Sequence, residues 1–383
     1  MSGTLPGEFW LDGVMTSPTM HMPAGSGVGR VVRTLKDGYW DRTEVVEYAD
    51  GSFRVRKSSK GDAPPGPWGV AALRKEIEYL STLPEPAREA FPPVLAAWDD
   101  TSAEPPRVGY EMPFYGHHID AGELARKGTL AQAEIDLYQE TLAEVLLERV
   151  HAPAAPGGQP LSVHIASVVK DALCALEADP ALARLIRAES IQLNGERQAG
   201  PRTALASALT DRALVAALDG EPQLRLHGDL FLENTLWRRA ERVPSAGVDP
   251  PRLLLIDPVS VAGVVHGPPL FDLVKYESYA TGVLLALRCE WVDVGGFDGA
   301  DDYWNRVRWE SAELTPFRTL DWHRRFRCAF EAKYGPVNRR AYRLIDGYFS
   351  VAMAVNTSGT QRRARLLKAT QDFNAAGIDH RLR

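Results

Sequence analysis

The chain has few cysteines, no excess of basic residues and no long apolar run. Its three cysteines, Cys174, Cys289 and Cys328, lie far apart and outside any metal-ligand spacing, so we expect free, buried thiols and a reducing cytoplasm. No run approaches the roughly 20 apolar residues of a membrane-spanning helix, and the first residues lack the basic and then apolar pattern of a secretory signal. We therefore expect a cytoplasmic protein that does not associate with membranes.

The charge balance argues against nucleic acid as a partner. The 44 Lys and Arg residues face 50 Asp and Glu residues, a formal net charge of −6, whereas proteins that neutralise phosphates usually show a basic excess or stripe. Hydrophobic residues make up 45% and charged residues 25% of the chain, as in ordinary globular proteins. A length of 383 residues exceeds one average domain, so we expect two lobes, as a monomer or a homodimer.

The β-strand signals concentrate in the first part of the chain. Residues 1–24 are rich in Gly, Pro, Ser and Met and are predicted to form a flexible leader. Two β-prone runs, 43–48 and 52–57, are joined by Ala49-Asp50-Gly51, a typical hairpin turn. Apolar residues then recur at helical spacing from Leu73 to Leu83. Another strand is predicted at 108–112.

Helical patterns dominate the rest of the chain. They are predicted at 129–151, 161–188, 203–218 and from 269 to the end, with short strands at 223–226, 235–237 and 252–256. The expected fold class is α+β, with a small β-rich N-lobe at 25–115 and a larger, mainly helical C-lobe at 116–383.

The strongest chemical signal is the segment HGDLFLEN at 227–234. His227, Asp229 and Asn234 have the spacing of a phosphoryl-transfer loop, in which the Asp accepts the proton of the attacking hydroxyl and the Asn amide oxygen binds Mg²⁺. The apolar run Leu253–Ile256 then leads into Asp257. A carboxylate at a strand end is suited to be the second Mg²⁺ ligand.

The segments HGDLFLEN, LLIDP and GPPLFDL, in this order, resemble the aminoglycoside phosphotransferase and choline kinase-like family, small-molecule relatives of the protein kinases. The resemblance covers about fifty residues and implies a two-lobed, protein-kinase-like fold. It also implies that Asp272 supports the catalytic loop through hydrogen bonds. We interpret His227 as a residue that orients the loop, because Asp229 already fills the position of the proton acceptor.

The resemblance places the nucleotide site upstream of these blocks. Lys57 ends a predicted strand and is a candidate for pairing the α- and β-phosphates, although a solvated surface lysine is an alternative. Its expected partner is Glu76 on the following helix. Glu78 competes for this role, but it lies on a face about 200° away, so only one of the two can pair with Lys57.

Two further nucleotide contacts are expected. The pattern becomes strand-like from about Val31, and the loop Lys36-Asp37-Gly38-Tyr39-Trp40 follows before the run 43–48. Gly38 in this loop is predicted to cover the phosphates, because the Gly25–Gly29 cluster precedes Lys57 by 28 residues or more, too many for one hairpin. With a single glycine, this loop departs from the usual glycine-rich pattern. Main-chain atoms of Glu111 and Met112 are expected to bind the adenine edge, although 110–114 is equally interpreted as an edge strand.

These residues predict a small-molecule kinase that uses ATP or GTP with Mg²⁺. The acceptor hydroxyl could belong to an aminoglycoside, sugar, nucleoside or other natural product, so antibiotic resistance and natural-product modification are both open. The acidic residues after Asp272 could bind a polycation or form a solvated face, and they are Glu277, Glu290, Asp293, Asp298, Asp301 and Asp302. The alternatives are a nucleotide-binding pseudokinase with a regulatory or scaffold role, and a protein kinase.

Overall fold

The computed structural model describes residues 29–38, 41–60, 67–100, 102–103, 106–152, 159–220, 222–239, 251–259, 263–299 and 302–377. The predicted flexible leader, 1–24, lies outside these residues, as do Gly25 and Gly27. Of the helices within these ranges, none is both long and apolar enough to cross a bilayer.

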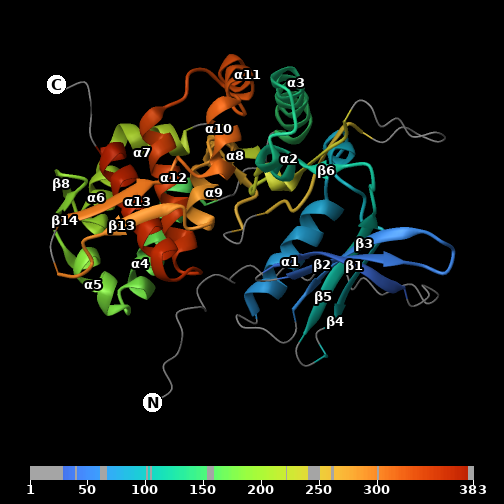
Figure 1. Cartoon of the computed structure of the whole chain (residues 1–383), viewed down its shortest axis with the longest axis horizontal. Coiled ribbons are helices and arrows are strands. Elements are labelled where there is room, and N and C mark those ends of the chain that lie inside the picture. The colour runs from blue at the N-terminus through green and yellow to red at the C-terminus, as the bar shows by residue number, and fades with distance from the viewer. Residues whose placement is uncertain are drawn as a thin grey trace.

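The N-terminal part of the described chain is a five-stranded antiparallel sheet with one helix against it (Figure 1). In spatial order its strands are β1 (Arg30–Asp37), β2 (Asp41–Glu47), β3 (Phe53–Ser59), β5 (Arg107–Pro113) and β4 (Ala96–Asp100). The predicted turn joins β2 to β3. Gly51 adopts a left-handed φ of 80° there, a conformation that glycine adopts without steric cost.

Helix α1 (Pro67–Ser81) packs on this sheet over a small apolar core that includes Val55, Leu73 and Val108. Side chains alternate along a strand, so Lys57, two residues after Val55, leaves β3 on the face that α1 covers. Glu76, three residues after Leu73, lies on the sheet-facing side of the helix. The amphipathic pattern of α1 therefore brings an acid and a base together under the sheet.

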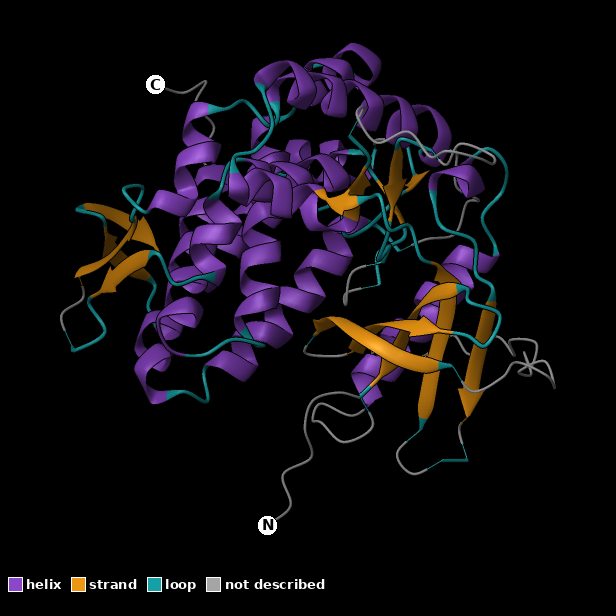
Figure 2. Ribbon diagram, turned by 45° about the vertical axis from the view of Figure 1, so that its right-hand side comes forward, coloured by secondary structure: helices purple, strands orange, loops and turns teal. Residues whose placement is uncertain are grey.

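The C-terminal part of the described chain is mainly helical (Figure 2). It contains most of the buried apolar side chains. Its helices are α2 (Ala121–Lys127), α3 (Gln132–Ala143), the π-helix η3 (Glu144–Val150), α4 (Leu161–Leu176), α5 (Pro180–Arg187), α6 (Pro201–Thr210), α7 (Arg212–Asp219), α8 (Leu270–Ala280), α9 (Val283–Arg288), α10 (Thr315–Thr319), α11 (Arg324–Tyr334), α12 (Arg339–Ala354) and α13 (Gly359–Gly377). Short 3-10 segments are η2 (Ala87–Ala90), η4 (Leu232–Asn234) and η5 (Ala312–Leu314). A β-rich part followed by a helical part confirms the predicted α+β class.

Two small sheets hold the segments that carry the sequence motifs. One has the order β11 (Leu253–Leu255), β10 (Thr235–Trp237) and β6 (Ile119–Asp120), and the other pairs β12 (His266–Gly267) with β9 (Leu224–Arg225). Strand β10 begins directly after Asn234, and β11 ends two residues before Asp257. The predicted short strands are confirmed, and their pairing brings the two motif segments side by side.

The prediction of helix from residue 269 to the end is wrong between 292 and 307. Strands β13 (Val292–Gly295) and β14 (Asp302–Val307) form a hairpin there. The hairpin joins β7 (Ser190–Leu193) and β8 (Glu196–Ala199) in a four-stranded sheet. Strand β14 pairs in parallel with β7, more than a hundred residues earlier, so no local pattern reveals it. Strand β4, between α1 and β5, was not predicted either.

The three cysteines are free, as expected, but they are exposed and not buried. The reason is helix geometry. Cys174 follows the buried Leu173 on the amphipathic helix α4, and Cys328 lies between the buried Phe326 and Phe330 on α11. Both positions face away from the core.

Candidate active site

Lys57 and Glu76 form a buried ion pair under the N-terminal sheet. Lys57 Nζ lies 2.9 Å from Glu76 Oε1 and 2.8 Å from Oε2, and the two residues are 3% and 5% exposed. Tyr110, opposite Lys57 in the β3–β5 register, donates its hydroxyl to Glu76 Oε1 at 2.7 Å. Glu78, the competing partner, is exposed. The structure thus brings together the pair expected from the sequence.

The charges of this pair depend on a third residue, Asp257. Burial lowers the pKa of Lys57, but Asp257 and Glu76 more than reverse this and raise its pKa well above the usual value. Burial also raises the pKa of Glu76 to about 7, against the opposing effect of Lys57. Lys57 is therefore firmly protonated, and its ammonium group is shared by the carboxylates of Glu76 and Asp257.

Asp257 connects the two lobes. Its Oδ1 lies 2.9 Å from Lys57 Nζ and its Oδ2 lies 3.5 Å from Lys36 Nζ. Burial raises the pKa of Asp257, but Lys57 and Lys36 outweigh burial and hold the pKa well below its usual range. Asp41 adds a further carboxylate, 3.5 Å from Lys57 Nζ. Asp257 itself has a left-handed φ of 52°, a strained backbone state of the kind that clusters at functional sites.

The connection between β1 and β2 lies beside this cluster. Gly38 is in this connection, as predicted, and its carbonyl oxygen accepts a hydrogen bond from Lys60 Nζ at 2.8 Å. Tyr39 and Trp40 lie outside the described residues. Lys36, at the end of β1, was named only as part of this loop. Its contact with Asp257 depends on the approach of the two lobes, which no local pattern reports.

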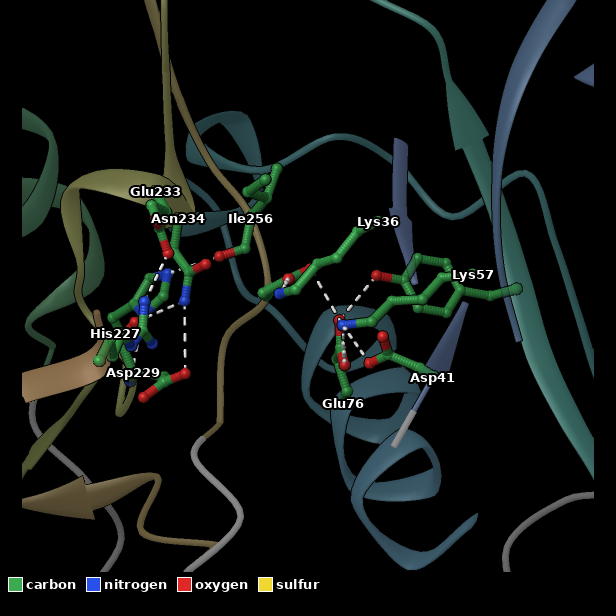
Figure 3. A network of polar contacts seen from close by, with 12 residues as sticks. Lys36, Asp41, Lys57, Glu76, His227, Asp229, Glu233, Asn234 and Ile256 are labelled. Carbon is green, nitrogen blue, oxygen red and sulfur yellow. Dashed lines mark hydrogen bonds and ion pairs between the residues drawn. The ribbon is translucent and has the colours of Figure 1, made fainter. Parts of the chain in front are cut away.

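The catalytic-loop segment is held in one conformation by its own hydrogen bonds. Asn234 Nδ2 donates to Asp229 O at 2.8 Å and to Asp229 Oδ2 at 3.3 Å. His227 Nε2 lies 3.0 Å from the carbonyl oxygen of Ile256, and its Nδ1 accepts from Asp229 N at 3.3 Å. Figure 3 shows His227, Asp229, Asn234 and Ile256 grouped on one side of Lys36, and Lys57 with Glu76 on the other. His227 therefore ties the loop to the segment that presents Asp257.

Asp272 fixes the backbone of the same loop. Its carboxylate accepts hydrogen bonds from the backbone N–H groups of His227 and Gly228, both at 2.8 Å, and lies 3.1 Å from His151 Nε2. Gly228 has a left-handed φ of 80°, which a side chain would strain. These are the supporting hydrogen bonds that the resemblance implies for Asp272.

The predicted metal ligands suit Mg²⁺ by their donor chemistry. Asn234 uses its Nδ2 group to bind Asp229, which leaves Oδ1 as an oxygen donor, and Asp257 supplies an ionised carboxylate. Mg²⁺ in phosphoryl-transfer sites usually takes one or two protein oxygens and completes its shell with phosphate oxygens and water. Because the backbone N–H of Ile256 donates to Asn234 O at 2.9 Å, the two ligands come from adjoining segments.

Sequence reasoning missed Lys275, which lies on α8 three residues after Asp272. Its Nζ is 2.9 Å from Asp229 Oδ1, and the residue is only 5% exposed. Burial lowers the pKa of Lys275, whereas Asp229 opposes that effect. The available signal was a cation in the first turns of α8, where every other residue except Asp272 is apolar and faces the core.

The predicted adenine contacts lie within the sheet. The carbonyl oxygen of Glu111 accepts from Leu95 N at 2.8 Å, and its carboxylate lies 2.8 Å from Arg56 and 3.3 Å from Arg54. Met112 is 7% exposed and pairs with Val55. The adenine-binding role of the two residues stays a prediction.

Solved structures with a similar fold include three kinases of small molecules. A candidate fructosamine-3-kinase from Thermobifida fusca is 16% identical, with a TM-score of 0.47 over 90% of this chain and 93% of that one. For an aminoglycoside phosphotransferase from Streptomyces rimosus the identity is 18% and the TM-score 0.45, over 88% and 94% of the two chains. A choline kinase from Cryptosporidium parvum has 10% identity and a TM-score of 0.40, over 92% and 89%.

The two lobes of this chain are defined by its own elements. They are the five-stranded sheet with the Lys57–Glu76 pair under one helix, and the helical lobe with the loop from His227 to Asn234. At identities below 25% and TM-scores below 0.5, the similar structures say nothing of what this chain acts on. No family model matches the sequence, and no curated protein matches it.

Proposed function

We propose that this protein is a phosphotransferase that moves the γ-phosphoryl group of ATP to a hydroxyl of a small molecule. One observation carries the proposal. The candidate base Asp229, the metal ligands Asn234 and Asp257, and the pair Lys57–Glu76 form one site between the lobes. Phosphoryl transfer needs little else from a protein, because positioning and charge neutralisation supply most of the catalysis.

In this mechanism Lys57 leaves its contact with Asp257 to bind the nucleotide phosphates and keeps Glu76 as its partner. Asn234 and Asp257 would hold Mg²⁺, which would supply positive charge to the phosphates. Asp229 orients the acceptor hydroxyl and takes its proton. The amide of Asn234 and the ring of His227 hold the loop so that the Asp229 carboxylate stays aligned. In this proposal GTP is the alternative phosphoryl donor. The cytoplasm is the expected compartment.

The pseudokinase alternative draws no support from the site. A silent member would be expected to lack a charged group of the phosphoryl-transfer set, whereas Asp229, Asp257 and Lys57 are all present and in contact with other site residues. The alternative was suggested by the single glycine in the loop between the first two strands. Lys36, at 3.5 Å from Asp257, supplies a positive charge next to that loop.

The proposal is tested with the full chain in two steps. First, Mg·ATP should raise the melting temperature of the wild type and do so much less in Lys57→Ala. Arg74→Ala, which removes a partly exposed ion pair with Asp99 in the same lobe, serves as the control. Second, a panel of hydroxyl compounds should yield a phosphorylated product detectable by mass spectrometry. Absence of any Mg·nucleotide binding would contradict the proposal.

A further inference from the structure

The acceptor side of Asp229 is rich in cations. Lys275 Nζ, 2.9 Å from the Asp229 carboxylate, also lies 4.3 Å from the centre of the Phe231 ring. On the same ring lies the guanidinium of Arg288, at 5.1 Å. Arg288 and Arg126 each contact the carboxylate of Glu233 at 2.6 Å. The catalytic loop is therefore surrounded by basic side chains from α2, α8 and α9.

Arg365, on α13, adds a buried cation that forms no ion pair with a carboxylate among the described residues. The residue is 2% exposed, and its Nε is buried with no hydrogen-bond partner. Burial, together with repulsion by Arg288, lowers the pKa of Arg365 to about 10. A buried guanidinium nitrogen without a partner is costly. Such a group is expected where an anionic ligand completes the site.

The charge around the loop is unbalanced in the same direction. Lys275 pairs with Asp229, Arg288 pairs with Glu233, and Arg126 interacts with both Glu233 and Asp120. Arg365 is therefore the cation of this group that has no ion pair with a carboxylate among the described residues. Helix α13 packs against α9, and Arg288 and Arg365 both repel Lys275, so these cations share one region. A polycationic acceptor would increase this repulsion, whereas an anion would relieve it.

The acidic residues considered for binding a polycation are engaged elsewhere or lie apart from this region. Glu277 pairs with Arg327 and Asp293 lies 3.6 Å from Arg308. Glu290, Asp298 and Asp302 are exposed near or on the β13–β14 hairpin, and Asp301 lies outside the described residues.

We propose that the acceptor is an anion: a small hydroxyl compound that also carries a carboxylate or phosphate group. Arg365, with Arg288, binds the anionic group, and Lys275 lies beside Asp229 where the hydroxyl is phosphorylated. This inference rests on the proposed kinase function and names its acceptor class. An aminoglycoside or another polycation is the class that the site disfavours.

The first test compares kcat/KM with Mg·ATP for four matched acceptors: gluconate, glucose 6-phosphate, glucose and glucosamine. An anionic compound should be the best acceptor, and the first two distinguish a carboxylate from a phosphate. A preference for glucose or glucosamine would overturn the inference. If Mg·ATP binds but no compound is phosphorylated, binding is measured directly with 6-phosphogluconate, which carries both anionic groups. The lack of any thermal shift would then overturn the inference as well.

The second test uses Arg365→Gln with Arg363→Gln as the matched control. Arg363 lies on the same helix but faces Phe297, with its guanidinium 5.0 Å from the ring centre. We expect Arg365→Gln to weaken binding of the anion roughly tenfold or more and to leave Mg·ATP affinity unchanged, while melting at or above the wild-type temperature. Equal anion affinity in the two variants would contradict the assignment of Arg365. If the wild type does not bind Mg·ATP, the kinase proposal itself is contradicted.

Discussion

Asp257 is the residue at which the two lobes meet, because its carboxylate contacts Lys57 at 2.9 Å and Lys36 at 3.5 Å. The two lysines keep its pKa well below the usual range in spite of burial, so the group is ionised at any pH at which the enzyme would work. An ionised, oriented carboxylate is what Mg²⁺ requires. Asn234 offers the ion only an amide dipole.

This difference in charge leads to a prediction for the two metal ligands. Asp257→Ala should weaken Mg·nucleotide binding roughly tenfold or more, and more than Asn234→Ala does, because only the first removes a full charge from the ion. Asp41→Ala is the control, since it removes a carboxylate near Lys57 that is not assigned to the metal. Isothermal titration with Mg·ADP measures all three. Affinities unchanged in both ligand variants would rule out this metal site.

At the scale of elements, single polar side chains join helices that are far apart in the sequence. Gln139 on α3 is fully buried and caps the start of α11. Its Oε1 accepts from the backbone N–H groups of Arg325 at 3.0 Å and Phe326 at 3.2 Å, and its Nε2 donates to Asp321 O at 2.6 Å. At this N-terminal end the N-cap residue His323 makes no capping bond, and Asp321 Oδ1 accepts from Arg324 N at 2.9 Å. Gln139 satisfies the next two backbone donors, which the helix leaves open.

Gln139→Leu should therefore lower the free energy of unfolding by about 2–4 kcal/mol, because it leaves several buried polar groups unpaired. The measurement is urea denaturation followed by circular dichroism. Glu140→Gln is the control, since its ion pair with Arg325 is exposed and should be worth about 0.5 kcal/mol or less. Equal effects of the two substitutions would show that Gln139 does not hold α11.

His164 joins α4 to α12 and makes their packing depend on pH. Its Nε2 lies 3.0 Å from the hydroxyl of Tyr348, and burial, with a smaller effect of Lys75, lowers its pKa from 6.5 to about 4. The lowered value in the folded state means that the stability which neutral His164 contributes is complete above pH 6.5. It is lost as pH falls toward 4, because the unfolded chain takes up the proton first.

We expect the wild type to lose about 2 kcal/mol relative to His164→Gln between pH 6.5 and pH 5, from the shift in proton binding alone. Melting temperatures of both proteins at pH 7 and pH 5 measure this difference. A gap between wild type and His164→Gln that is the same at both pH values would contradict the prediction.

The elements that could be predicted from the sequence are those with a local signal. Helical spacing from Leu73 placed Glu76 toward Lys57, and the fixed spacing of HGDLFLEN placed Asn234 beside Asp229. Strand β14 escaped prediction because it pairs with β7, far away in the chain. Arg365 and Lys275 escaped for the same reason, since only the packing of α8, α9 and α13 brings their charges together.

At the scale of the whole molecule, the site depends on contacts between the lobes. Besides the contacts of Asp257, the hydroxyl of Tyr79 on α1 donates to Leu226 O at 2.9 Å, and Phe91 stacks on His227 at 5.9 Å between ring centres. Figure 3 shows Lys57 on one side of Lys36 and the loop residues His227, Asp229 and Asn234 on the other. The central claim is that Asp229 acts on the acceptor and not on the nucleotide.

The most direct measurement of this claim is phosphoryl transfer by Asp229→Asn, compared with its affinity for Mg·ATP. The substitution keeps the shape of the side chain but removes the proton acceptor. We expect the transfer rate to fall by roughly 10²–10⁴-fold, while Mg·ATP affinity, measured by titration, stays within a few fold of the wild type. A variant that transfers phosphate at nearly the wild-type rate, or that loses Mg·ATP binding while still folded, would contradict the role assigned to Asp229.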